Sequence, residues 1–316
     1  MQFSTPVNID SQGLRINHGN RILLAGSCFT ENIGNMLTDS GFLTKVNPFG
    51  ITYNAISIAD CIETCLSGIE LTEDDLVYGN GLWHSWQHHG SFSNAGKAAC
   101  LEACNNAVSE THGFLKGTDT LILTLGTSTV YQLAGSDTIV NNCHKFPAAG
   151  FKKRLATLEE QKTRYTELIR LLKTQNPDIR IIFTISPIRH WRDGYRENQV
   201  SKSILHMLVH ELQNGFGNIF YFPAYEILMD ELRDYRFYDS DMLHPSPVAV
   251  EYIWEKFTGA YFDDTTMNLV KEVGQWRKMS RHRPLFPESE EYARFLDKLQ
   301  TLEDNLSEKL PHLFGK

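Results

Sequence analysis

The stretch "LLAGSCFTENIG" (residues 23–34) joins an apolar run to a segment with helical periodicity. The run ends at Gly26, and Phe29 and Ile33 then recur at the spacing of one helix face. In open α/β sheets, ligands bind beyond the carboxyl ends of strands, near the point where the strand order reverses. We therefore expect Ser27 to lie at a strand end where a site can form.

The first 262 residues alternate short apolar runs with longer amphipathic segments, which is typical of strands and crossover helices in a parallel sheet. We predict five strands, at residues 21–25, 42–46, 118–125, 179–185 and 218–222. The predicted fold is α/β, a three-layer α/β/α, doubly wound arrangement with a central, mostly parallel five-stranded sheet.

Two regions depart from this alternation. An insertion over about 70–117 begins with an aromatic and histidine-rich stretch and continues into a helix over 95–114. Residues 263–316 are charged and helical, with Pro284 and Pro287 between two helices. We expect a domain over 1–262 and a helical C-terminal extension packed on that same domain.

The composition bounds the function. The chain has 316 residues, 41% of them hydrophobic, and a formal net charge of -8. Nucleic acids and anionic membranes attract clustered positive charge, so we expect neither as a partner. A short basic cluster over 277–283 is expected to be a solvated or docking stretch, with a polyanion site as the lesser alternative. Without a signal-peptide pattern at its start, the chain is expected to be cytoplasmic.

Metal binding is a minor alternative at two places. Cys61 and Cys65, with Cys100 and Cys104, form two pairs that could face each other, but buried cysteine is also a common small apolar residue. The histidine-rich stretch around His84 could likewise bind a metal, contact substrate, or pack structurally. We expect no metal and no cofactor.

Ser27 itself has two interpretations. A serine opening a helix is a favoured N-cap. At a helix N-terminus, a serine is also well placed as a nucleophile, because the helix dipole favours developing negative charge. Such a nucleophile needs a base and an orienting group, and "FYDSDMLHPSP" (residues 237–247) supplies His244 and Asp241 in one loop.

Several ordered motifs together resemble the GSCFA family, within the SGNH (GDSL-like) hydrolases, which are flavodoxin-like esterases and lipases. The motifs are "GSCF" at 26–29, "NPFGITYN" at 47–54, "TLGTS" at 124–128, "NCHK" at 142–145, "SPIRH" at 186–190 and "DMLHPS" at 241–246. The resemblance covers most of the first 262 residues and implies an SGNH hydrolase fold.

The resemblance implies Ser27 as nucleophile, His244 as general base and then acid, and Asp241 as its orienting group. It also implies an oxyanion hole made by the amides of Ser27 and Gly50. The superfamily's third block is usually Gly-x-Asn-Asp, and Ser128 stands here in the place of the asparagine.

Other residues are candidates around this site. A serine hydroxyl reaches less far than an asparagine amide, so Asn54 or His144 could serve as a further oxyanion donor. Asn54, His144, His89 and Arg189 are our candidates for the substrate pocket. Cys28 is an alternative nucleophile, but we expect its side chain to point into the core.

These residues lead to two hypotheses. The first is a serine ester hydrolase that acts through an acyl-enzyme on Ser27 and deacylates a carbohydrate or another small acyl ester. The second is a non-catalytic carbohydrate- or ligand-binding module that keeps the hydrolase scaffold, because fold alone does not establish activity.

Overall fold

The computed structural model describes residues 4–315, and one five-stranded sheet lies at its centre. Its strands are β1 (Arg21–Gly26), β2 (Leu43–Val46), β5 (Thr120–Leu125), β9 (Arg180–Ile185) and β10 (Ile219–Tyr221). The spatial order is β10-β9-β5-β1-β2, and every neighbouring pair is parallel. This is the flavodoxin-like order, with its switch point between β1 and β5. The predicted fold class and all five strands are confirmed.

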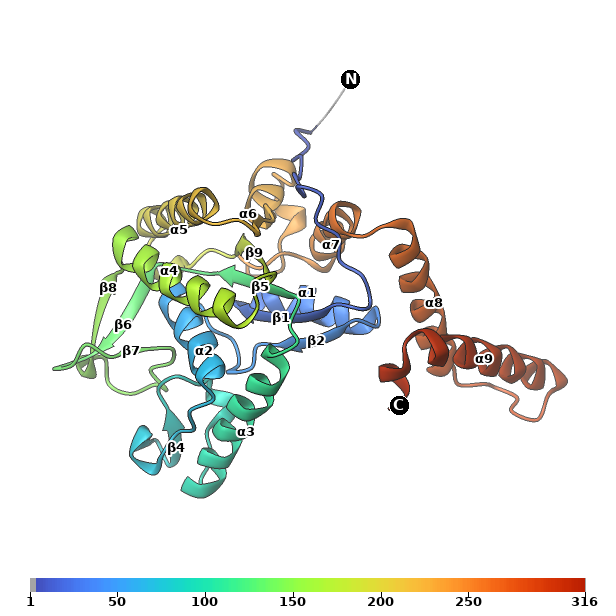
Figure 1. Ribbon diagram of the computed structural model, residues 1–316, viewed down its shortest axis with the longest axis horizontal. Helices are drawn as coiled ribbons and strands as arrows, with labels where there is room; N and C mark the ends of the chain where they lie inside the picture. The colour runs from blue at the N-terminus through green and yellow to red at the C-terminus, as the bar shows by residue number, and fades with distance from the viewer. Residues whose placement is uncertain (1–3, 316) are drawn as a thin grey trace.

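Helices cover both faces of the sheet (Figure 1). One face carries α2 (Ala55–Ser67), α4 (Leu158–Gln175) and α5 (Tyr195–Gly215), with α3 (Lys97–Leu115) packed against α2. The other face carries α1 (Cys28–Asp39) and α7 (Pro247–Tyr261), with the short α6 (Ala224–Glu226) near β9. The result is the three-layer arrangement that the alternating sequence pattern predicts.

The apolar run of β1 is continuous because both faces of the strand are buried. Leu23 packs with the α2, α4 and α5 side chains, whereas Ile22 and Leu24 pack with those of α1 and α7. Successive side chains of a strand point to opposite faces, so a strand covered by helices on both sides lacks alternating polarity. This burial fixes the position at which the strand delivers Ser27.

Two smaller sheets flank the main one. The insertion contains a hairpin of β3 (Leu76–Gly79) and β4 (Leu82–Ser85), followed by α3 near its expected position. The second, which we did not predict, joins β6 (Thr129–Leu133), β7 (Ile139–Val140) and β8 (Phe151–Leu155) in the order β7-β6-β8. We call this sheet the β6–β8 arm.

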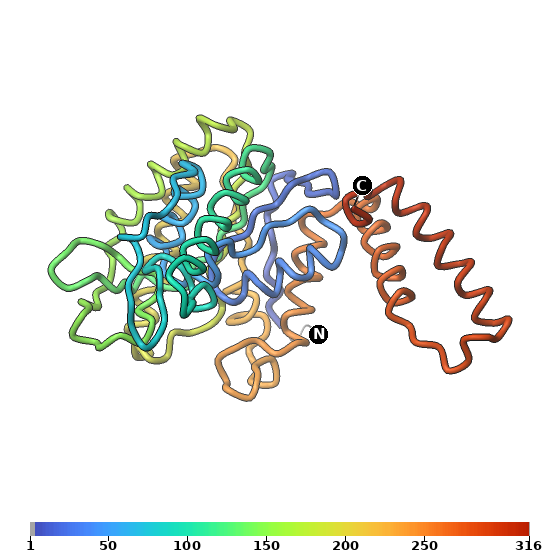
Figure 2. Tube along the Cα trace, turned by 90° about the horizontal axis from the view of Figure 1, so that it is seen from below, coloured from blue at the N-terminus to red at the C-terminus, as the bar shows by residue number. Residues whose placement is uncertain are grey.

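The C-terminal helices α8 (Asp264–Ser280) and α9 (Glu290–Lys309) form a hairpin that stands off the α/β body (Figure 2). The start of α8 packs on the body through Met267 and Val270. Farther along, the His312 ring lies 2.9 Å from the carbonyl oxygen of Gly41. That the extension and the body form one domain stays a prediction. Across residues 4–315, every helix is too short or too polar to span a bilayer.

Candidate active site

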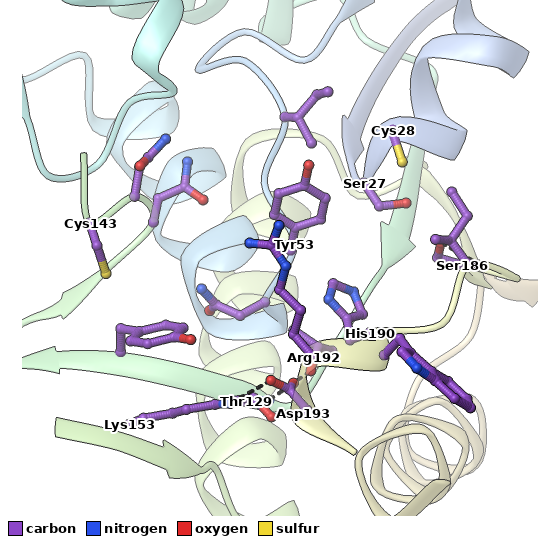
Figure 3. Close-up of a pocket in the computed structure, with 18 of the residues that line it drawn as sticks. Ser27, Cys28, Tyr53, Thr129, Cys143, Lys153, Ser186, His190, Arg192 and Asp193 are labelled. Atoms are coloured by element: carbon purple, nitrogen blue, oxygen red, sulfur yellow. Dashed lines mark hydrogen bonds and ion pairs between the residues drawn. The ribbon is translucent and has the colours of Figure 1, made fainter. Parts of the chain in front are cut away.

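A cavity of about 980 Å³ opens at the carboxyl edge of the sheet. The ends of β1, β5 and β9 contribute Ser27, Thr127 and Ser186 to its lining, and the β6–β8 arm contributes Tyr131 and other side chains. Figure 3 shows Ser27 and Ser186 on one side of this space and Lys153 of the arm on the other. Because the carboxyl ends of parallel strands meet at one edge, residues far apart in the chain converge there. We call this space the carboxyl-edge cavity.

Ser27 follows a tight turn made possible by Gly26. At Gly26, φ is +146°, and a Cβ atom there would lie 2.3 Å from the backbone oxygen of Thr124. Ser27 occupies the N-cap position of α1, yet its side chain does not cap the helix. Its hydroxyl has no hydrogen-bond partner within residues 4–315. Helix capping therefore does not explain the hydroxyl of Ser27.

Asp241 and His244 form a hydrogen-bonded pair in the loop before α7. The Nδ1 atom of His244 lies 2.5 Å from Oδ2 of Asp241. The other carboxylate oxygen accepts the amides of Leu243 and His244, each at 2.9 Å. These bonds, led by the His244 amide, lower the pKa of Asp241 to about 2, so the carboxylate is charged at neutral pH.

Ser27 and His244 line the same cavity but lie at different depths. Ser27 is 1% exposed, whereas the side chains of His244 and Asp241 are 48% and 45% exposed. Since the Ser27 hydroxyl has no partner in the described chain, no hydrogen bond joins it to His244. The structure thus brings Ser27 and His244 to one cavity, with Asp241 behind the histidine, but does not link serine to histidine. Such a contact often tightens only when substrate binds.

Two expected oxyanion donors point elsewhere. The Gly50 amide donates to the Asn47 carbonyl at 2.8 Å, within a turn. Ser128 is fully buried, and its hydroxyl donates to the Ser201 carbonyl at 3.0 Å. Neither residue lines the cavity. The expected oxyanion hole is therefore corrected at these two positions. The Gly50 amide is bonded within the turn after β2, and the Ser128 hydroxyl is bonded to α5.

Other donors remain near Ser27. Its own amide makes a long bond of 3.2 Å to the Thr124 carbonyl. Asn54 lines the cavity, and its Nδ2 donates one proton to the Ser57 hydroxyl at 2.9 Å, which leaves a second proton. The first amides of α1, beginning at Cys28, have no side-chain cap.

Two of the four candidate residues for the substrate pocket line the cavity, and two do not. Asn54 and Arg189 line the cavity, but His89 and His144 do not. The Nε2 atom of His144 lies 2.8 Å from the Ser85 carbonyl. His89 packs against Gly50, where an added Cβ would lie 2.4 Å from the histidine. These two histidines therefore support loops around the cavity.

The possible metal ligands are used for packing. Both ring nitrogens of His84 have hydrogen-bond partners, the Ser93 hydroxyl and the Gly79 carbonyl. The paired cysteines of α2 and α3 are buried in apolar clusters. Residues 4–315 contain no group of three or more His, Cys, Asp or Glu side chains placed to hold a metal ion.

Cys28 departs from our expectation, because it lines the cavity beside Ser27 instead of pointing only into the core (Figure 3). Burial raises the pKa of its thiol. The thiolate is the reactive form of cysteine, so this environment weakens Cys28 as a nucleophile.

Our sequence analysis missed Arg192 and Lys202. Arg192 lines the cavity, two residues after the "SPIRH" motif. Lys202 is 2% exposed, its Nζ donates to the Ser186 carbonyl at 2.6 Å, and burial lowers its pKa to about 7. The sequence did contain a signal for Lys202, because it lies on the same helix face as the apolar Leu205. A lysine on an apolar face is unusual, since lysine is rarely buried.

The fold and the cavity define a class: a doubly wound α/β protein with serine, histidine and aspartate at the switch-point edge of its sheet. The GSCFA family model matches residues 21–257, and a model described as "GSCFA domain protein, C-terminal domain" matches residues 273–315. The chain belongs to the GSCFA family, as its motifs predicted.

Comparisons with other proteins add distant similarities. A search of curated proteins found no match. A Clostridium thermocellum family 3 carbohydrate esterase is 13% identical, with 81% of this chain and 98% of that chain covered and a TM-score of 0.37. A putative platelet activating factor from Streptococcus pneumonia is 12% identical, with coverages of 75% and 83% and a TM-score of 0.39. At 12% and 13% identity, neither the substrates nor the residue roles of these proteins transfer to this chain.

Proposed function

We propose that the chain is a serine ester hydrolase of SGNH type that deacylates a carbohydrate or another small acyl ester. The observation that carries the proposal is that Ser27, at the end of β1, and His244, in the loop before α7, line one cavity, with Asp241 bonded to the His244 ring. The Ser27 hydroxyl adds support, since no hydrogen bond within residues 4–315 accounts for it.

The proposed reaction passes through an acyl-enzyme. Ser27 Oγ attacks the ester carbonyl while Nε2 of His244 takes its proton, and Asp241 holds Nδ1 of the ring. The tetrahedral intermediate then expels the alcohol, which receives the proton from His244. Water, activated by the same histidine, releases the acid and restores Ser27. For the oxyanion we propose the amides at the start of α1 together with Asn54.

The test is covalent labelling by a fluorophosphonate probe, measured by intact mass. We expect one adduct on the wild-type chain, none on Ser27→Ala, and an unchanged adduct on the matched control Cys28→Ala. We expect His244→Ala to slow labelling by about 100- to 10,000-fold, the usual contribution of a general base. A folded wild-type protein without an adduct, or an adduct that survives Ser27→Ala, contradicts the proposal.

A non-catalytic binding module is the second candidate. It is favoured by the engaged amide of Gly50 and the buried hydroxyl of Ser128, which remove two expected oxyanion donors. Such a module would bind its ligand without being labelled at Ser27, so the same experiment separates the two functions.

A further inference from the structure

The carboxyl-edge cavity has an excess of positive charge. Lys153, Arg189, Arg192 and Asp193 line it. Lys153 and Asp193 cancel each other in an ion pair of 2.5 Å. Neither arginine has a carboxylate within ion-pair distance in the described residues, although the chain as a whole carries a net charge of -8. Two guanidinium groups that make no ion pair within residues 4–315 thus line one cavity of an acidic protein. Asp230 lies near Arg189 but lines a neighbouring pocket and not this cavity.

The loop that carries Arg192 is held on both sides. The amide of His190, before it, donates to Oδ1 of Asn198 at 2.9 Å. The carboxylate of Asp193, after it, is paired with Lys153 of the β6–β8 arm. Arg192 projects from this loop toward Tyr53, into the middle of the cavity (Figure 3). Its guanidinium is therefore presented by a fixed backbone, which lowers the entropic cost of binding.

Two further basic residues, Lys202 and Arg189, lie behind and beside this wall. Lys202 is buried beneath Ser186, a lining residue, and bonds to its carbonyl. Arg189 donates to the sulfur of Met229 at 3.4 Å, a neutral partner. Glu31 on α1 is an acidic group close enough to act on Tyr53, but it does not line the cavity. The charges that face a bound ligand are therefore mainly cationic.

We propose that the acyl ester taken by this cavity carries a carboxylate or phosphate group, which Arg192 binds and Arg189 helps to neutralise. The inference rests on the proposed function and specifies its substrate class, an O-acylated acidic or phosphorylated sugar. A planar guanidinium matches the oxygens of both groups with paired hydrogen bonds. Tyr53, Tyr131 and Phe151 supply aromatic walls, and the cavity of about 980 Å³ accommodates a sugar with its acyl group.

The test is calorimetric binding of glucose, glucuronate and glucose 6-phosphate to the Ser27→Ala protein at constant ionic strength. We expect the charged sugars to bind at least about 10-fold more tightly than glucose, as a charge-assisted hydrogen bond provides. In the double variant Ser27→Ala/Arg192→Met, the charged sugars should bind no more tightly than glucose. The matched control, Arg196→Met, replaces an 82% exposed arginine on α5 outside the cavity and should preserve the difference.

The outcomes separate the two proposals. Equal affinity for the three sugars, including no measurable binding of any, overturns the inference, as does an equal effect of the two arginine variants. The tighter of the two charged sugars identifies carboxylate or phosphate as the bound group. Charge-selective binding without fluorophosphonate labelling of the wild-type protein overturns the esterase function alone.

Discussion

Lys202 is a buried lysine whose amine donates a hydrogen bond to the neutral carbonyl of Ser186. Burial lowers its pKa from 10.5 to about 7. Lys202 in turn contributes, after burial, to the lowered pKa values of His190 and His206. The unfolded chain solvates this ammonium fully, so Lys202 destabilises the fold wherever it must be charged.

The sign of the pH dependence follows from this shift. Below pH 7, Lys202 is protonated in both the folded and the unfolded chain, and the cost of burying its charge applies in full. Between pH 7 and 10.5 the unfolded state binds more protons than the folded state, so stability rises with pH. We expect the free energy of unfolding of the wild type to rise relative to that of Lys202→Met across this window, with no relative change below it.

Urea titrations of the two proteins at several pH values measure this difference. The matched control is Lys298→Met, because Lys298 is exposed on α9. Its stability should follow the wild-type curve at every pH. Parallel curves for Lys202→Met and the wild type would show that the buried ammonium does not titrate in this window.

At the scale of elements, the close pairing of β1 with β5 positions the candidate nucleophile. The β1 strand ends at Gly26, whose backbone contacts Thr124 of β5 too closely for any side chain. An alanine there meets both this contact and a positive φ. We expect Gly26→Ala to lower the free energy of unfolding by about 2–4 kcal/mol.

A helical glycine provides the control. Gly259 lies in α7, and an added Cβ meets nothing within 4 Å. Gly259→Ala should therefore stabilise the protein by about 0.5–1 kcal/mol, the difference in helix propensity. Chemical denaturation of both variants measures the two changes, and similar stabilities would argue against a close contact between Gly26 and Thr124.

At the scale of the whole molecule, the α8–α9 hairpin has its own small apolar cluster around Val273, Leu306 and Leu310. A chain ending at Asp263 loses this cluster, the α8 contacts with the body and the ion pair of Arg277 with Asp39. We expect it to fold and to keep fluorophosphonate labelling, with a free energy of unfolding lower by about 2–4 kcal/mol.

Circular dichroism, denaturant titration and intact mass of the shortened chain measure these properties. An aggregated or unfolded product would mean that the hairpin belongs to the folding unit of the body. Loss of labelling in a folded product would instead link the hairpin to the carboxyl-edge cavity.

The sequence by itself determined the architecture. The five strands of the main sheet and their crossover helices produce local periodicities. All five strands were therefore predictable, as was the position of Ser27 at a strand end. Asp241 and His244 were predictable as a pair because they lie three residues apart in one turn. The short β6–β8 arm escaped prediction, since its strands are brief and partly polar.

Tertiary structure alone decided which side chains meet at the cavity. It turned Ser128 toward α5 and used the Gly50 amide in a turn, while it brought Arg192 and Cys28 to the cavity. Local periodicity shows which face of an element is apolar. The direction of a side chain in a turn depends instead on backbone angles and on long-range packing partners, and only the folded chain fixes these.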